Sequence, residues 1–179
     1  MNALQNNQEL VDRFGVVAQR FCSLVDTASN MGRAELVAEI YRILPSLIGE
    51  AMKLPNVHPS EKVGQIAPTG KPALLSNDRM THGEWTQLYN FFKEQLADWD
   101  LYRQVFDPTK DQDTVVGSLA DDLADIYRDL KEGLVLNETH QASPEDIIWE
   151  WRFSFYSHWG KHAIDALQTI HCRISESNM

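Results

Sequence analysis

The stretch that decides the fold reads Ser118-Leu-Ala-Asp-Asp-Leu-Ala-Asp-Ile-Tyr-Arg-Asp-Leu130. Its large apolar residues recur three and four positions apart, at Leu119, Leu123, Ile126 and Leu130. This spacing puts them on one face of an α-helix, whereas a half-buried strand would alternate. Ser118 is well placed to cap the helix, and Gly133 is predicted to end it.

The same periodicity covers most of the chain. Further helices are predicted over residues 7–26, 32–54, 81–99 and 144–174. Thr81 with Glu84 has the pattern of a capping box, and Ser143 followed by a proline predicts the start of the last helix. Pro45 predicts a kink or break in the second helix, because a proline removes a backbone hydrogen bond there.

Between these helices, residues 101–106 are predicted to add one helical turn and residues 109–117 to form a loop. Residues 55–79, in which proline and glycine recur, are predicted to form a long loop that is either a flap or a lid. We therefore predict an all-α fold. Residues 1–179 would form a single domain, an up-and-down bundle of about five main helices.

The chain of 179 residues carries 16 Lys plus Arg against 26 Asp plus Glu, a formal net charge of −10. Such a surface repels phosphate backbones and anionic lipids, so we predict neither a nucleic-acid partner nor a membrane partner. The N-terminus lacks a signal-peptide pattern, and a cytoplasmic location is predicted. Cys22 and Cys172 are predicted to be buried, reduced thiols, although they could pair if the first and last helices pack together.

The aspartates of the central stretch allow two interpretations. On a helical wheel Asp122 and Asp129 lie at the border of the apolar face, whereas Asp121, Asp125 and Glu132 point nearly opposite to it. The plain interpretation is a solvated acidic face with a charged first turn. Residues 121–125 also match the D-D-x-x-D pattern with which isoprenoid synthases hold magnesium diphosphate, but no second acidic motif of the expected kind follows.

The last predicted helix contains Trp149-Glu-Trp-Arg-Phe-Ser-Phe-Tyr-Ser-His-Trp-Gly-Lys-His162. His162 falls within its apolar face and His158 at the edge of that face. Two histidines four residues apart can bind one transition-metal ion, and Asp122, Asp129 or Glu150 would complete the ligand set if the two helices are antiparallel neighbours. The short connection between these helices predicts that they are. Alternatively, each histidine is a structural residue that forms a hydrogen bond with an aspartate.

No complete motif for nucleophilic catalysis or phosphate binding is present, so it stays open whether the protein is an enzyme. The first hypothesis is a non-catalytic helical domain that binds another protein or forms a homo-oligomer, with Trp149 directed away from the core. The alternative is a metal-binding bundle, a hydrolase or an oxidoreductase, in which His158, His162, Asp122 and Asp129 hold a divalent metal ion. A third is a small-molecule pocket under residues 55–72.

Three stretches resemble a bacterial family catalogued only as a domain of unknown function. They are residues 115–133 around S-L-A-D-D-L-A-D-I-Y-R-D-L, residues 149–162 with W-E-W-R-F and H-W-G-K-H, and residues 98–108. The resemblance spans nearly the whole chain, from the first helix to about Cys172. It implies an all-helical bacterial cytosolic domain, and it implies no activity, catalytic residue or cofactor.

Overall fold

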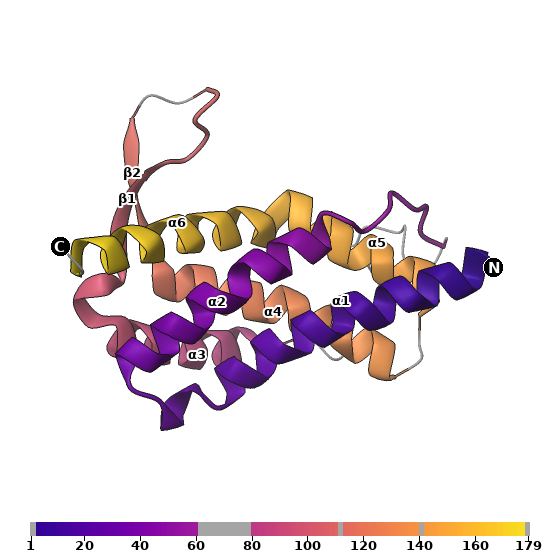
Figure 1. Ribbon diagram of the computed structural model, residues 1–179, viewed down its shortest axis with the longest axis horizontal. Coiled ribbons are helices and arrows are strands. Elements are labelled where there is room, and N and C mark those ends of the chain that lie inside the picture. The colour runs from indigo at the N-terminus through magenta and orange to yellow at the C-terminus, as the bar shows by residue number, and fades with distance from the viewer. Residues whose placement is uncertain (1–2, 61–79, 111–112, 140–141, 178–179) are drawn as a thin grey trace.

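The computed structural model describes residues 3–60, 80–110, 113–139 and 142–177. Its helices are α1 (Ala3–Asp26), α2 (Arg33–Ala51), α3 (His82–Leu96), α4 (Leu119–Glu138), α5 (Pro144–Ser154) and α6 (Gly160–Ser177). The shorter elements are the 3₁₀ turns η1 (Ala28–Asn30) and η3 (Ala97–Trp99), the π-helical turn η4 (Phe155–Trp159), and strands β1 (Leu101–Val105) and β2 (Thr114–Ser118). Figure 1 shows the helices side by side and the two-stranded hairpin projecting from them. The predicted all-α class is confirmed, with this hairpin as an addition.

The apolar faces of the helices meet in one core. α4 packs against α1, α3, α5 and α6, so it is surrounded by other helices along much of its length. Phe14 of α1 packs against Trp151 of α5, with ring centroids 4.8 Å apart, and both side chains are buried. Trp159, Phe155 and Ile170 are buried as the helical spacing predicts. Burial of these stripes is the main source of stability for such a bundle.

α4 continues to Glu138, beyond Gly133, where the sequence predicts its end. The glycine is required for packing and does not terminate the helix. A Cβ atom at Gly133 would lie 2.0 Å from Nε1 of Trp151, so the missing side chain makes room for the indole. Nε1 of Trp151 donates to the carbonyl of Leu130 at 3.5 Å. α5 can therefore approach α4 closely at this point.

The prediction of a helical turn over residues 101–106 is wrong, and so is that of a loop over residues 114–117, because these segments supply the two strands of an antiparallel hairpin. Leu101 lies opposite Ser118, and Val105 lies opposite Thr114. The strands have five residues each and are largely exposed, too short and too polar to show a clear alternation. The ring of Tyr102 covers Gly117, where a Cβ atom would lie 2.4 Å from Cζ of the tyrosine. The hairpin thereby holds Tyr102 next to α4.

Three predicted helix starts are confirmed. Thr81 and Ser143 form capping boxes with the residues three positions later, and Ser118 accepts a hydrogen bond from the backbone N–H of Asp121 at 3.2 Å. The predicted break at Pro45 is wrong, because α2 runs through this residue. Residues 55–60 form neither helix nor strand, whereas the rest of the predicted flap or lid, residues 61–79, lies outside the described residues.

Both cysteines are free thiols, Cys22 buried and Cys172 exposed. The prediction of a buried thiol is therefore confirmed for Cys22 and wrong for Cys172, which lies on the outer side of α6. Within the described ranges, no helix is both long enough and apolar enough to cross a membrane.

Candidate metal centre

α4 and α6 lie next to each other, as the sequence predicts, and this brings the aspartates of α4 to the two histidines. His158 belongs to the π-helical turn η4, and His162 lies in the first turn of α6. The centroids of the two imidazole rings are 4.9 Å apart. All four residues predicted as metal ligands therefore meet in one place.

Each imidazole ring is held from behind by one buried carboxylate. Nδ1 of His162 lies 2.7 Å from Oδ1 of Asp122, and Nδ1 of His158 lies 2.7 Å from Oδ2 of Asp129. An ionised carboxylate only accepts hydrogen bonds, so each Nδ1 is the donor and carries the hydrogen. In a neutral ring, the lone pair is then on Nε2, on the other side from the supporting aspartate.

The two Nε2 atoms point toward the same oxygen atom. Nε2 of His158 and Nε2 of His162 each lie 3.5 Å from Oδ2 of Asp125. A good N–H···O hydrogen bond is shorter, about 2.7–3.2 Å. A zinc ion about 2.0–2.1 Å from three ligand atoms in tetrahedral geometry would separate those atoms by about 3.3 Å. The three residues offer ligand atoms that all lie within 4.8 Å of one another, a spacing that leaves room for a metal ion.

The second oxygen of Asp125 is occupied. Nε1 of Trp85 donates to Oδ1 of Asp125 at 2.8 Å, and the guanidinium of Arg128 lies 2.8 Å from the same oxygen. Trp85 belongs to α3, which packs over this side of α4. These contacts fix the carboxylate so that Oδ2 faces the histidines.

The interpretation of a solvated acidic face is wrong for most of these residues. Asp122, Asp125, Asp129 and Glu132 are all buried, and Asp121 is half-buried. The helical wheel placed Asp125 away from the core because it considered the apolar residues of α4 alone. α3 covers that side as well, so the direction that looked solvated on the wheel faces another helix.

A hydroxyl from the hairpin completes the support of Asp122. The hydroxyl of Tyr102 donates to Oδ2 of Asp122 at 2.8 Å. Burial raises the pKa of Asp122, although the hydrogen bonds from His162 and Tyr102 counteract this. Burial, together with the negative charge of Asp122, also raises the pKa of Tyr102, so the phenol remains a donor.

The neighbouring carboxylates also affect the pKa of His162. Burial lowers the pKa of His162, but the hydrogen bond to Asp122 and the charges of the neighbouring aspartates outweigh it, and the net pKa is raised. The ring therefore binds a proton more tightly than a free imidazole does. A metal ion at Nε2 would have to displace that proton at neutral pH.

The π-helical turn positions His158 relative to α6. The backbone N–H of Gly160 reaches the carbonyl of Phe155, five residues earlier, which defines the turn. A Cβ atom at Gly160 would lie 2.3 Å from that carbonyl oxygen, so the turn requires glycine at this position. Such turns are frequent at functional sites, where they reorient a side chain within a helix.

The sequence predicts His158, His162, Asp122 and Asp129 as ligands, but not Asp125. In the structure Asp122 and Asp129 lie behind the histidines, and Asp125 borders the gap. The spacing could have identified Asp125, because Asp122, Asp125 and Asp129 are three and four residues apart and therefore share one face of α4. Nothing in their spacing identified Trp85 and Tyr102, which come from other elements.

The structure thus defines a helical bundle with a buried cluster of histidines and aspartates. The chain matches the model of Domain of unknown function (DUF5063) over residues 5–175 and belongs to this family, in agreement with the resemblance seen in the sequence. No curated protein matches it. The crystal structure of protein BF1032 from Bacteroides fragilis is similar, with a TM-score of 0.68 and 24% identity over 88% of this chain and 87% of that chain. At this identity the likeness shows the fold alone.

Proposed function

We propose that the protein binds one divalent transition-metal ion between α4 and the η4–α6 segment. Oδ2 of Asp125 and the Nε2 atoms of His158 and His162 are the ligands. The convergence of both nitrogens on one oxygen, at 3.5 Å each, is the observation that carries this proposal. Three protein ligands leave at least one position for water or substrate, as in metal centres that carry out reactions.

The donor set favours some metals over others. Two imidazoles with one carboxylate fit zinc or iron(II), whereas calcium and magnesium prefer oxygen ligands alone. Asp122 and Asp129 would orient the rings and increase the basicity of Nε2, the usual role of carboxylates behind metal-bound histidines. The side chain of His158 is 36% exposed, so the centre is open to solvent.

Reconstitution of the purified chain tests the proposal. Isothermal titration with Zn²⁺, Fe²⁺ and Mn²⁺, followed by metal analysis after dialysis, is expected to show about one ion per chain. Asp125→Asn, His158→Gln and His162→Gln are each expected to weaken binding by about 100-fold or more. His171→Gln, an exposed histidine further along α6, is the matched control. Less than about 0.2 ion per chain, or equal affinity in the ligand variants, would reject the proposal.

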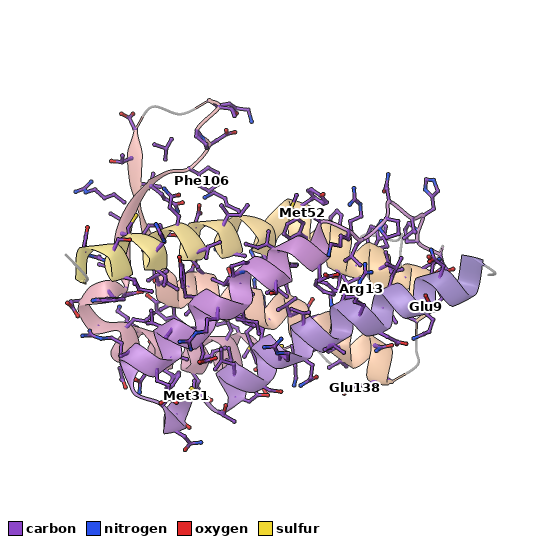
Figure 2. All side chains as sticks on the ribbon, viewed as in Figure 1. Glu9, Arg13, Met31, Met52, Phe106 and Glu138 are labelled. Atoms are coloured by element: carbon purple, nitrogen blue, oxygen red, sulfur yellow. The ribbon has the colours of Figure 1, made fainter. Side chains whose placement is uncertain are left out.

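Protein interaction remains a second candidate, and the hairpin favours it. Leu101, Phe106 and Val116 are 58%, 62% and 64% exposed. Figure 2 shows Phe106 beside α6, where the hairpin leaves the bundle. Exposed apolar side chains grouped on a projecting element are typical of contacts with a protein partner or a second copy of the chain. A chain that sediments as a strict monomer and captures no specific partner would remove this candidate.

The proposal also includes the cellular setting. The formal net charge of −10 supports a cytoplasmic protein whose partners are neither nucleic acid nor membrane. Fractionation of cells that produce the chain at its natural level tests the location.

A further inference from the structure

We propose that Asp121 is the proton acceptor of this centre and that the loaded centre hydrolyses neutral or cationic esters or amides. This inference rests on the proposed function, because it assigns a reaction class to the same site. It concerns Asp121, the aspartate of this cluster whose carboxylate accepts no hydrogen bond from a described side chain.

Asp121 lies close to two of the proposed ligands, Asp125 and His162, whose charges act on its carboxylate. A carboxylate oxygen of Asp121, one of Asp122 and a ring nitrogen of His162 all lie within 4.8 Å of one another. Asp121 forms no hydrogen bond with either residue, so this spacing suits contact through one water molecule. Asp121 is half-buried, and its backbone N–H is bound by the capping hydroxyl of Ser118, which anchors the residue in the first turn of α4.

Among the described residues, the carboxylate of Asp121 differs from its neighbours in having no hydrogen-bond or ion-pair partner. Asp122 accepts from Tyr102 and His162, Asp125 from Trp85 and Arg128, and Asp129 from His158. Within the described part of the chain, the carboxylate of Asp121 forms neither a hydrogen bond nor an ion pair. Burial and the negative charge of Asp125 raise the pKa of Asp121. Both properties suit a group that takes up and returns a proton.

The charge of the site determines which substrates can approach. The cluster contains four carboxylates, those of Asp121, Asp122, Asp125 and Asp129, and Arg128 pairs with two of them, Asp125 and Asp129. With a divalent ion bound and both histidines neutral, the net charge is about −1. Lys161 does not compensate, because it is paired with Asp165. A phosphate ester would be repelled, whereas a neutral or positively charged substrate would not.

Hydrolysis of an ester or amide at this centre needs only water as a second reactant. Water in the open position transfers a proton to Asp121 while its oxygen bonds to the carbonyl carbon of the substrate, and the π electron pair moves onto the carbonyl oxygen. When this pair returns, the bond to the leaving oxygen or nitrogen breaks, and that atom takes the proton from Asp121. The products are a carboxylic acid and an alcohol or amine.

Two substrates with the same leaving group test the inference on the zinc-loaded chain. Hydrolysis of neutral p-nitrophenyl acetate is expected to exceed that of anionic p-nitrophenyl phosphate by about tenfold or more. Asp121→Asn is expected to lower kcat by about 100-fold and to leave KM and zinc affinity within about threefold. Asp113→Asn, an exposed aspartate outside the site, is the matched control and should leave kcat unchanged.

The results that would contradict this inference differ from those that would contradict metal binding. If the zinc-loaded chain hydrolyses neither ester, prefers the phosphate, or is unaffected by Asp121→Asn, the inference is wrong and metal binding stands. If Asp121→Asn loses zinc, Asp121 is a ligand and the inference is also wrong. Absorption of the cobalt-loaded chain against pH gives a second readout, because loss of the acceptor should shift the ionisation of bound water even where turnover is slow. If the wild-type chain binds no metal, the proposed function fails first and this inference fails with it.

Discussion

At the scale of single residues, the role of each aspartate follows from which groups occupy its two oxygens. Asp122 and Asp125 lie within one turn of α4, yet Asp122 supports a histidine and Asp125 faces the gap. Tyr102 and His162 occupy both oxygens of Asp122, whereas Trp85 and Arg128 share one oxygen of Asp125 and leave the other toward the histidines. The partners that distinguish them come largely from other elements.

Removing the hydroxyl of Tyr102 tests the support of Asp122. Tyr102→Phe would leave one oxygen of a buried carboxylate without its donor, and we expect the free energy of unfolding to fall by about 1–3 kcal/mol. Urea denaturation measures this change. Tyr156→Phe is the control, because Tyr156 is 61% exposed and its loss should change stability by less than about 0.5 kcal/mol. Equal effects of the two substitutions would contradict the assigned role of Tyr102.

The two thiols should differ strongly in reactivity. Burial raises the pKa of Cys22 to about 12, so almost no thiolate is present at neutral pH, whereas Cys172 is exposed. Under native conditions a disulfide reagent is expected to label Cys172 rapidly and Cys22 only after denaturant is added. Cys172→Ser should remove the fast reaction, and rapid labelling that persists in this variant would show that Cys22 is accessible.

At the scale of elements, the last helical rod is regular except at the point where it reaches the histidines. α5, η4 and α6 follow one another without a loop, and the π-helical turn lies between them. A π-helical turn has poorer backbone packing than an α-helix, so its persistence needs compensation from the surroundings. The burial of Phe155 and Trp159 within this turn supplies part of it.

Adding a methyl group at Gly160 tests the turn. Gly160→Ala would place Cβ against the carbonyl of Phe155, and we expect a loss of about 1–3 kcal/mol in stability and a loss of about tenfold in metal affinity. Gly49→Ala in α2 is the matched control, because apart from the adjacent backbone of its own helix no described atom lies within 4 Å of the added methyl. The control should gain up to about 1 kcal/mol through helix propensity. A gain in both variants would mean that the turn tolerates a side chain.

At the scale of the whole molecule, the centre joins α4 to the η4–α6 segment, which α5 separates from it along the chain. α4 supplies the carboxylates, and the η4–α6 segment supplies the imidazoles, so a bound ion would connect them directly. Because a ligand that binds the folded state alone stabilises it by mass action, metal binding should raise the melting temperature. The hairpin is coupled to the same place through Tyr102 and Asp122.

The effect of pH follows from the raised pKa of His162. The folded state binds this proton more tightly, so the stability it contributes is complete below the ordinary value of 6.5 and is lost as pH rises through the raised pKa. The raised pKa of Asp122 acts in the same direction at lower pH. Metal binding shows the opposite trend, because the ion competes with the proton for His162.

We therefore expect the increase in melting temperature on adding zinc to be larger at pH 8 than at pH 6, with affinity about tenfold higher. Thermal unfolding with and without zinc measures the increase, and titration in buffers of different ionisation enthalpy detects the released proton. Chelator should reverse the effect. His162→Gln should remove the pH dependence, and an unchanged dependence in that variant would assign it to another group.

Local sequence patterns were enough to predict where most helices lie, the caps at their starts and the apolar core. Spacing of three and four between leucines, and a capping residue three positions before an acidic one, depend on neighbours along the chain. The sequence also indicated that the histidines and aspartates meet, because the connection between their helices is short.

Tertiary structure decided the rest. Trp151, from another helix, decides that Gly133 makes room for an indole and does not end α4. Pairing with residues 114–118 decides that residues 101–105 form a strand. The same holds for Asp125, which α3 covers and orients. Periodicity within one helix defines directions around its own axis, but the environment in each direction is set by the elements that pack there.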